Sequence, residues 1–237
     1  MTFNRFIALI LVISLSPLTL ADGNSIGKIY HPYVQLLEKE IEYAMLYQRD
    51  NDTAIESGFR HQLGYGQALS DTFFVEAYII AEDTYGEGSK VEAFELELKW
   101  QLTEQGELDN DWGLLFELEN EREDNIWEAS TTLIALHEWE QWILTNNFSV
   151  IYEAGSTIDN EFEAAYSGQL RYRNTASFEP AIELFQSQDT SAIGPMATGL
   201  VRLGGGKKLF WEFGVLIGVN DDTPDTNWKL NLEYEFQ

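Results

Sequence analysis

Residues 228–236 read WKLNLEYEF, and large apolar side chains alternate with polar ones along the whole stretch. One face carries Trp228, Leu230, Leu232, Tyr234 and Phe236, and the other carries the lysine, the asparagine and the glutamates. Successive side chains of a β-strand point to opposite faces of a sheet, so a period of two residues indicates a strand. This stretch therefore predicts a strand with one apolar side.

The same period recurs through most of the chain, and the stripe of an amphipathic helix is largely absent. These segments predict an all-β protein, an antiparallel transmembrane β-barrel of about 12 strands. Two regions, 126–154 and 177–203, have ambiguous faces, which leaves roughly ten or fourteen strands as alternatives. The predicted strands are 38–48, 54–66, 72–82, 90–102, 111–122, 126–138, 142–154, 161–173, 177–187, 194–203, 208–219 and 227–237.

The first residues have the three parts of a secretory signal peptide. Arg5 precedes an apolar run over residues 6–15, and residues 19–21 (TLA) offer a small-residue cleavage site. We expect residues 1–21 to be the signal peptide and residues 22–237 to form a single β-barrel domain. No other stretch of about 18 uninterrupted apolar residues occurs, so we expect no membrane-spanning helix.

The chain is strongly acidic, with 40 Asp and Glu against 14 Lys and Arg and a formal net charge of -26. Such a chain repels phosphate backbones, which argues against nucleic acid as a partner. Its 44% hydrophobic and 14% aromatic residues give enough apolar surface for a folded protein. It has no cysteine, so disulfides and thiolate metal sites are excluded. Residues 22–31, ahead of the first predicted strand, are expected to be a flexible lead.

Alternation alone does not say whether the apolar faces point into the barrel or into lipid. Trp, Tyr and Phe near the strand ends favour lipid, because they resemble the aromatic girdles of membrane barrels. The last strand carries Phe236 next to Gln237, which resembles the signal read by the barrel-assembly machinery. We therefore expect a protein of the Gram-negative cell outer membrane, in contact with outer-membrane lipid, lipopolysaccharide and that machinery. A soluble lipocalin-type barrel or a β-sandwich is the alternative.

Short motifs are spread along the expected mature chain. They are HPYV (31–34), EKEIEY (38–43), LGYG (63–66), LSD (69–71), FFVE (73–76), QLTEQGE (101–107), GLLFE (113–117), QLRYR (169–173) and FEP (178–180). Together they resemble a family of bacterial outer-membrane β-barrel proteins to which no activity is assigned. The resemblance implies export and a barrel, and it supplies neither an activity nor a functional residue.

If the apolar faces meet lipid, the opposite faces line the lumen, and most of their charges are acidic. Carboxylates in a narrow wall exclude anions, so our first hypothesis is a small cation-favouring or polar-solute pore. The second is a closed barrel whose basic residues cross-link the acidic wall, with a structural or envelope-interaction role. The candidate lumen-lining residues are Glu40, Glu42, Glu76, Glu95, Glu97, Lys99, Glu117, Glu119, Glu161, Glu163, Arg171, Arg173, Lys229, Glu233 and Glu235.

We expect no catalytic, cofactor-binding or metal-binding residues. The glutamates are so many that no pair stands out as an acid and a base. His31, His61 and His137 lie far apart in the sequence, and no nucleophile can be named beside them. A barrel enzyme is a third hypothesis, which a serine or aspartate hydrogen-bonded to His61 or His137 near the rim would support.

Overall fold

The computed structural model describes residues 26–50, 58–84, 88–123, 125–156 and 158–236, so the predicted signal peptide lies outside the described residues. No helix long and apolar enough to cross a membrane occurs in these ranges. Their strands are β1 Lys39–Arg49, β2 Gly58–Ala68, β3 Phe73–Thr84, β4 Gly88–Gln101, β5 Asp111–Glu121, β6 Trp127–Trp139, β7 Trp142–Ala154, β8 Glu161–Tyr172, β9 Glu179–Gln186, β10 Ser191–Gly204, β11 Lys207–Gly218 and β12 Thr226–Phe236.

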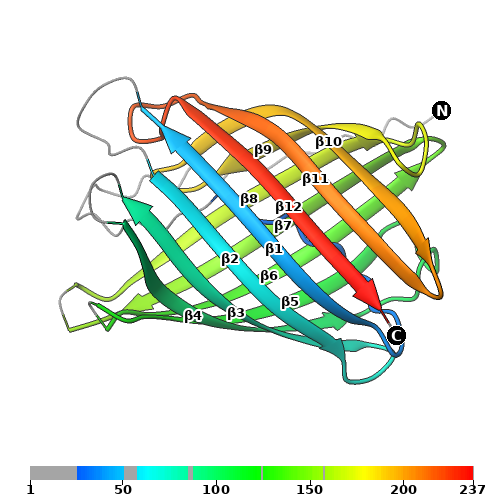
Figure 1. Ribbon diagram of the computed structural model, residues 1–237, viewed down its shortest axis with the longest axis horizontal. Coiled ribbons are helices and arrows are strands. Elements are labelled where there is room, and N and C mark those ends of the chain that lie inside the picture. Colours follow the sequence, from blue (N-terminus) through cyan, green and yellow to red (C-terminus); the bar gives the residue numbers. More distant parts are fainter. Residues whose placement is uncertain (1–25, 51–57, 85–87, 124, 157, 237) are drawn as a thin grey trace, which may run out of the picture.

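Each strand pairs in antiparallel fashion with its neighbours in the chain, and β1 also pairs with β12, so the sheet closes into a barrel (Figure 1). The prediction of a 12-stranded antiparallel barrel is therefore confirmed. β10 begins at Ser191 rather than at 194, because a turn closed by a hydrogen bond from Ser187 N–H to Thr190 O (2.7 Å) lets pairing start earlier. The predicted start of the second strand, at 54, falls outside the described residues.

The apolar face of the wall points outward. On β12, Trp228 is 40% exposed and the adjacent Lys229 is 5% exposed. On β11, Phe213 is likewise exposed and Glu212 is buried. A soluble barrel would bury these apolar side chains, whereas a barrel in lipid presents them to its surroundings.

Aromatic side chains pair on the outer wall near both ends of the barrel, as the sequence predicted. Interfacial aromatic rings of this kind are typical of the two edges of a membrane. At the end where β1 starts the pairs are Phe73–Trp100, Trp142–Tyr172 and Tyr234–Phe236, and at the opposite end they are Tyr47–Phe59 and Tyr152–Phe162.

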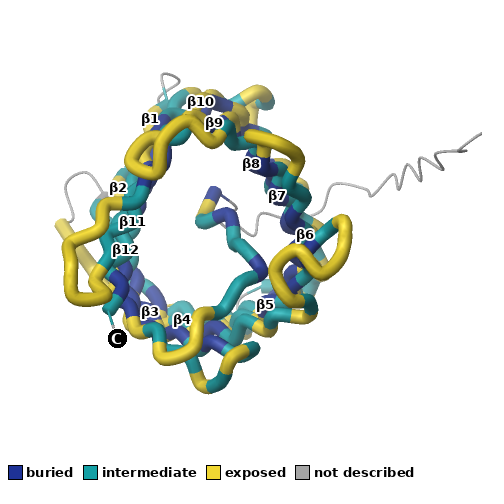
Figure 2. The backbone as a smooth tube through the Cα atoms, turned by 90° about the vertical axis from the view of Figure 1, so that its right-hand side faces the viewer, coloured by how far each residue is buried: buried dark blue, intermediate teal, exposed yellow. Residues whose placement is uncertain are grey.

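Residues 26–34, called the N-terminal segment below, lie inside the ring of strands (Figure 2). The expectation of a flexible lead over 22–31 is therefore wrong for residues 26–31, because their side chains and backbone have partners on the inner wall. Ile26 and Ile29 pack in a buried cluster with Leu46, Phe185, Ala192 and Leu216, called the inner apolar cluster. Leu46 breaks the alternation of β1 because it faces this segment.

The ambiguous faces of 126–154 and 177–203 come from apolar residues on the inner side of the wall. Apolar side chains sit on both faces of these strands, because the inner wall is partly apolar as well as polar. Those buried on the inner side include Ile134, Leu136, Ile143, Phe185, Ala192 and Met196.

Candidate functional site: the acidic lumen

Carboxylates of the inner wall form two rows that cross neighbouring strands, because residues paired across antiparallel strands share a face. The first acidic row consists of Glu235, Glu40, Glu76, Glu97 and Glu117, with Gly66 between Glu40 and Glu76. The second acidic row consists of Glu233, Glu42, Glu95, Glu119, Glu128, Glu153 and Glu161, with Gly64 and Tyr78 between Glu42 and Glu95. Like charges directly opposite each other destabilise a sheet, so these rows attract cations or protons.

Basic side chains neutralise the rows only in part. On the second row, Arg60 lies 3.4 Å from Glu119 Oε2, and it also pairs with Glu82 at 3.1 Å. At the end of the first row, Lys208 pairs with Glu235. Among the described residues, the carboxylates of the two rows outnumber the basic side chains that pair with them.

Lys28 reaches the rows from the N-terminal segment. Its ammonium pairs with Glu42 and lies 3.7 Å from Glu233 Oε2 and 4.0 Å from Glu76 Oε2. Burial by itself lowers the pKa of Lys28. The surrounding carboxylates, with Glu42 foremost, together raise the pKa by more than burial lowers it, so the net shift is upward. The lysine therefore stays charged and anchors the segment to the wall.

The backbone of the N-terminal segment is hydrogen-bonded to side chains of the wall. Tyr30 N–H donates to Asn147 Oδ1 (2.8 Å), and Asn147 Nδ2 donates back to the carbonyl oxygen of Tyr30 (3.0 Å). Val34 N–H donates to Gln101 Oε1 (2.7 Å), and the Tyr30 hydroxyl donates to Glu97. Wall side chains thus satisfy backbone groups that would otherwise be buried without partners.

The same segment also fits the wall by shape. A Cβ at Gly113 would lie 3.0 Å from Pro32 Cα, a tight contact, so the glycine gives the proline room to pack closely against the wall. Next to it, the Tyr33 hydroxyl donates to Asp111 Oδ2 (2.7 Å). Shape and polar contacts together fix the path of the segment.

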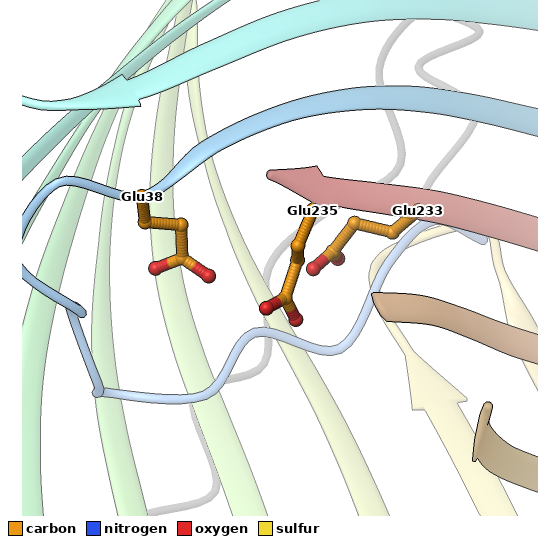
Figure 3. Close-up of side chains that lie close together, drawn as sticks. All are labelled: Glu38, Glu233 and Glu235. Atoms are coloured by element: carbon orange, nitrogen blue, oxygen red, sulfur yellow. The ribbon is translucent and has the colours of Figure 1, made fainter. Parts of the chain in front are cut away.

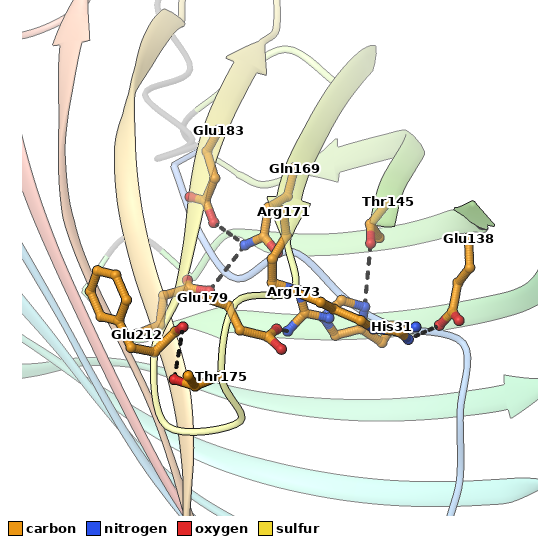
Figure 4. Close-up of polar contacts among 11 residues, drawn as sticks. His31, Glu138, Thr145, Gln169, Arg171, Arg173, Thr175, Glu179, Glu183 and Glu212 are labelled. Carbon is orange, nitrogen blue, oxygen red and sulfur yellow. Dashed lines mark hydrogen bonds and ion pairs between the residues drawn. The ribbon is translucent and has the colours of Figure 1, made fainter. Parts of the chain in front are cut away.

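His31 and Glu38 lie outside the strands and have shifted acidities. His31 Nδ1 is 3.4 Å from Thr145 Oγ1 (Figure 4), and burial, followed by the nearby charge of Arg171, lowers the pKa of His31 well below its usual value. The Glu38 carboxylate lies beside those of Glu233 and Glu235, with ligand oxygens within 4.8 Å of one another (Figure 3). Burial, followed by the charge of Glu235, raises the pKa of Glu38 to about 7.

A second polar network links β8, β9, β11 and β12. Lys229 Nζ is 3.0 Å from Glu183 Oε2 and 2.8 Å from Glu212 Oε1. Gln169 Nε2 donates to both carboxylates, at 2.7 and 3.2 Å (Figure 4). All four side chains are buried, and the network cross-links the wall as the closed-barrel hypothesis requires.

The described residues line a cavity of about 190 Å³ between the wall and the N-terminal segment. Its lining includes Lys28 and Tyr30 of the segment and seven glutamates, against Lys28, Arg60 and Lys229 as basic residues. Acidic side chains therefore outnumber basic ones in this lining by seven to three. The glutamates are Glu95, Glu117, Glu119, Glu121, Glu128, Glu153 and Glu163.

The structure places the candidate residues in different surroundings, and their role in lining a conduction path stays a prediction. Glu40, Glu42, Glu76, Glu97, Lys229 and Glu235 are buried. Glu95, Lys99, Glu117, Glu119, Glu161, Glu163, Arg171 and Glu233 are half-buried, and Arg173 is exposed. Arg171 pairs with Glu179 (3.4 Å), Arg173 pairs with Glu138 (2.6 Å), and the Lys99 ammonium lies 5.1 Å from the ring centre of Phe74.

Sequence reasoning missed the residues of the N-terminal segment and their partner Asn147. The segment reads IGKIYHPYV and has no period of two, so the pattern that predicts the strands does not mark it as structured. Its isoleucines, tyrosines and valine were the available signal, because a flexible lead is usually poor in large apolar residues.

The two remaining histidines do not form a catalytic arrangement. His61 Nδ1 is 2.9 Å from the Tyr43 hydroxyl, and His61 Nε2 is 3.6 Å from Asp83 Oδ2, beyond hydrogen-bonding distance. His137 Nδ1 is 2.6 Å from the backbone oxygen of Asp109. In the described ranges, neither histidine is hydrogen-bonded to a serine, so the enzyme hypothesis gains no nucleophile from this geometry.

Known structures with a similar fold are outer-membrane barrels. No protein-family model matches the chain, and no curated protein matches it in sequence. An outer membrane channel from Pseudomonas putida F1 has a similar structure (TM-score 0.56, 14% identity, covering 92% of this chain and 99% of that one). The KdgM porin in complex with disordered oligogalacturonate is also similar (TM-score 0.57, 11% identity, covering 84% of this chain and 99% of that one). So is the NanC porin (TM-score 0.53, 7% identity, covering 83% of this chain and 99% of that one). At these identities the likeness concerns the fold, and the chain has the fold of the outer-membrane β-barrels.

Proposed function

We propose that this chain is an outer-membrane channel that passes small cations or small polar solutes and favours cations. The observation that carries the proposal is the cavity between the two acidic rows and the N-terminal segment, whose lining has seven glutamates and three basic residues. In a narrow passage with low-dielectric walls, such an excess of carboxylates lowers the energy of a cation and raises that of an anion.

The candidate lumen-lining residues have a specific part in this proposal. Those of the two acidic rows supply the negative potential. Lys99, Arg171 and Arg173 lie nearer the end where β1 starts, where both arginines pair with glutamates. The N-terminal segment narrows the passage beside the rows, so solutes pass between it and the wall.

The proposal does not extend the solute of a structural neighbour to this chain. The KdgM porin is in complex with oligogalacturonate. Uronate units carry carboxylates, and the acidic cavity described here repels anionic ligands. Cations and neutral polar molecules fit its charge better.

The outward apolar belt and the aromatic pairs support insertion in the outer membrane. In this setting the protein contacts lipid and lipopolysaccharide and is inserted by the barrel-assembly machinery. A signal peptide over residues 1–21 would deliver a mature chain that begins near Asp22.

The closed barrel with a structural or envelope-interaction role is the second candidate. Two observations favour it: the buried Lys229 network, whose members satisfy one another, and the N-terminal segment inside the ring. Both remove open space from the lumen.

Planar-bilayer recordings with a salt gradient separate the two candidates. We expect conductance steps whose reversal potential shows cation preference. The double variant Glu119→Gln and Glu128→Gln, in the second row, should reduce that preference, whereas the control Glu104→Gln, exposed in the β4–β5 connection, should leave it unchanged. An inserted, heat-modifiable barrel that stays silent would favour the closed barrel, and anion preference would refute the proposed selectivity.

A further inference from the structure

We propose that four carboxylates of the inner wall form a binding site for a divalent cation such as Ca²⁺. Lys28 occupies this site in the structure, and the free cation competes with Lys28 for it. The four residues are Glu40, Glu42, Glu76 and Glu233. The inference concerns binding and holds whether or not the barrel conducts. It departs from the expectation that the chain has no metal-binding residues.

The carboxylates of this site converge from three strands. Glu40, Glu42 and Glu233 each place an oxygen within 4.8 Å of the others. Glu76 adds a fourth carboxylate, since its Oε2 lies 4.0 Å from the Lys28 ammonium that pairs with Glu42. The site is thus centred on a position that a positive charge already holds.

Two glycines of β2 make the convergence possible. Gly66 separates Glu40 from Glu76 in the first row, and Gly64 separates Glu42 from Tyr78 in the second. A Cβ at Gly64 would lie 2.4 Å from Tyr78 Cε1, so the tyrosine ring covers this glycine, which is the register partner of Glu42. With no side chains on β2 at these two positions, groups from β1 and β3 meet across it.

Among the residues that the structure describes, two buried atoms at this place have no hydrogen-bond partner, Glu76 Oε1 and the Tyr78 hydroxyl oxygen. Glu76 is 3% exposed and Tyr78 is 4% exposed. Buried polar atoms are nearly always partnered, and unpaired ones at a charged cluster indicate a capacity for a further ligand. This observation is independent of the grouping of Glu40, Glu42 and Glu233.

An ammonium satisfies such a site only in part. Lysine offers about three donors and one charge, whereas four carboxylates, when deprotonated to bind a metal ion, offer about eight acceptor oxygens and four negative charges. Ca²⁺ takes about six to eight oxygen ligands, with carboxylates among the preferred ones. A divalent cation therefore matches this donor set better than Lys28 does, both in charge and in ligand number.

Competition follows from the geometry. A cation bound between Glu42, Glu76 and Glu233 would lie next to the Lys28 ammonium, and the two positive charges would repel each other in a site of low dielectric. Binding of the cation therefore releases one anchor of the N-terminal segment, while the contacts of Ile29 and Tyr30 remain.

Tb³⁺ luminescence in the purified barrel tests this, because nearby tyrosines such as Tyr30 and Tyr78 sensitise a bound Tb³⁺ ion and Ca²⁺ can be titrated against it. Lys28→Met keeps the apolar stem, removes the competitor and should tighten Ca²⁺ binding by about tenfold or more. Glu42→Gln and Glu76→Gln should weaken it by about tenfold or more.

Glu161→Gln is the matched control, because Glu161 belongs to a separate carboxylate group with Glu153 and Glu163. It should leave the Lys28-dependent binding step unchanged. Heat-modifiable gel mobility checks that each variant is folded. If Lys28→Met leaves Ca²⁺ affinity within about twofold of the unsubstituted chain, or if folded Glu42→Gln and Glu76→Gln bind as before, the proposal is overturned. A silent barrel in bilayers would instead count only against the channel function.

Discussion

Truncation of Ile29 should undock the N-terminal segment without weakening the barrel. Ile29 is 6% exposed and packs in the inner apolar cluster. Ile29→Ala removes three carbons, which at about 0.8 kcal/mol per buried methylene costs about 2.4 kcal/mol. Since about 1.4 kcal/mol is a factor of ten, the ratio of docked to undocked segment should fall about 50-fold. The strands keep all their pairing, because Ile29 is not part of the sheet.

Single-channel recording measures this ratio as the time spent in narrow against wide conductance levels. The control Ile217→Ala removes the same atoms from the outer face of β11, where Ile217 is exposed, and should not change the ratio. An unchanged ratio in a folded Ile29→Ala barrel would refute the claim that the inner apolar cluster holds the segment. A loss of heat-modifiable mobility would show that Ile29 supports the sheet itself.

Three further outcomes follow from the polar contacts. Lys229→Met leaves the buried carboxylates of Glu183 and Glu212 without their cation, so the free energy of unfolding in urea should fall by about 3 kcal/mol; equal stability would contradict the network's role. Burial lowers the pKa of His31, so the neutral imidazole favours docking of the N-terminal segment above about pH 6.5, and this contribution is lost as the pH falls. The fraction of docked segment should therefore decrease at low pH, and the decrease should be smaller in His31→Gln. The pKa of Glu38 is raised to about 7, so its contribution to stability is full below its usual value of 4.5 and is lost as the pH rises through 7. Urea unfolding across that range should show a smaller pH dependence in Glu38→Gln, and identical profiles would count against the raised pKa.

The fold could be predicted from the sequence because alternation is a local property. The alternation in residues 228–236 (WKLNLEYEF) predicts a strand and its two faces whatever the strand pairs with. The same pattern elsewhere predicts the other strands of the wall. Aromatic residues near strand ends then indicated which face meets lipid.

The acidic rows could not be predicted, because they depend on register. Alternation places Glu42 and Glu95 on inner faces, but only the pairing of β1 to β4 shows that Gly64 and Tyr78 lie between them. Glycines two residues apart on an inner face, Gly64 and Gly66, were a sign of close approach.

The N-terminal segment was missed for a related reason. Its contacts with Asn147 and Glu97 join residues that are far apart in the chain, and it has no repeating pattern of its own. Tertiary contacts, rather than local propensity, determine its path.

Hydrogen exchange of the N-terminal segment tests the central claim most directly, because it needs neither conduction nor a known solute. The amides of Tyr30 and Val34 donate to Asn147 and Gln101 inside the barrel. We predict that in the purified, folded barrel both amides exchange far more slowly than in a free peptide of the same sequence. Exchange at the free-peptide rate would contradict a lumen occupied by the chain's own N-terminal segment.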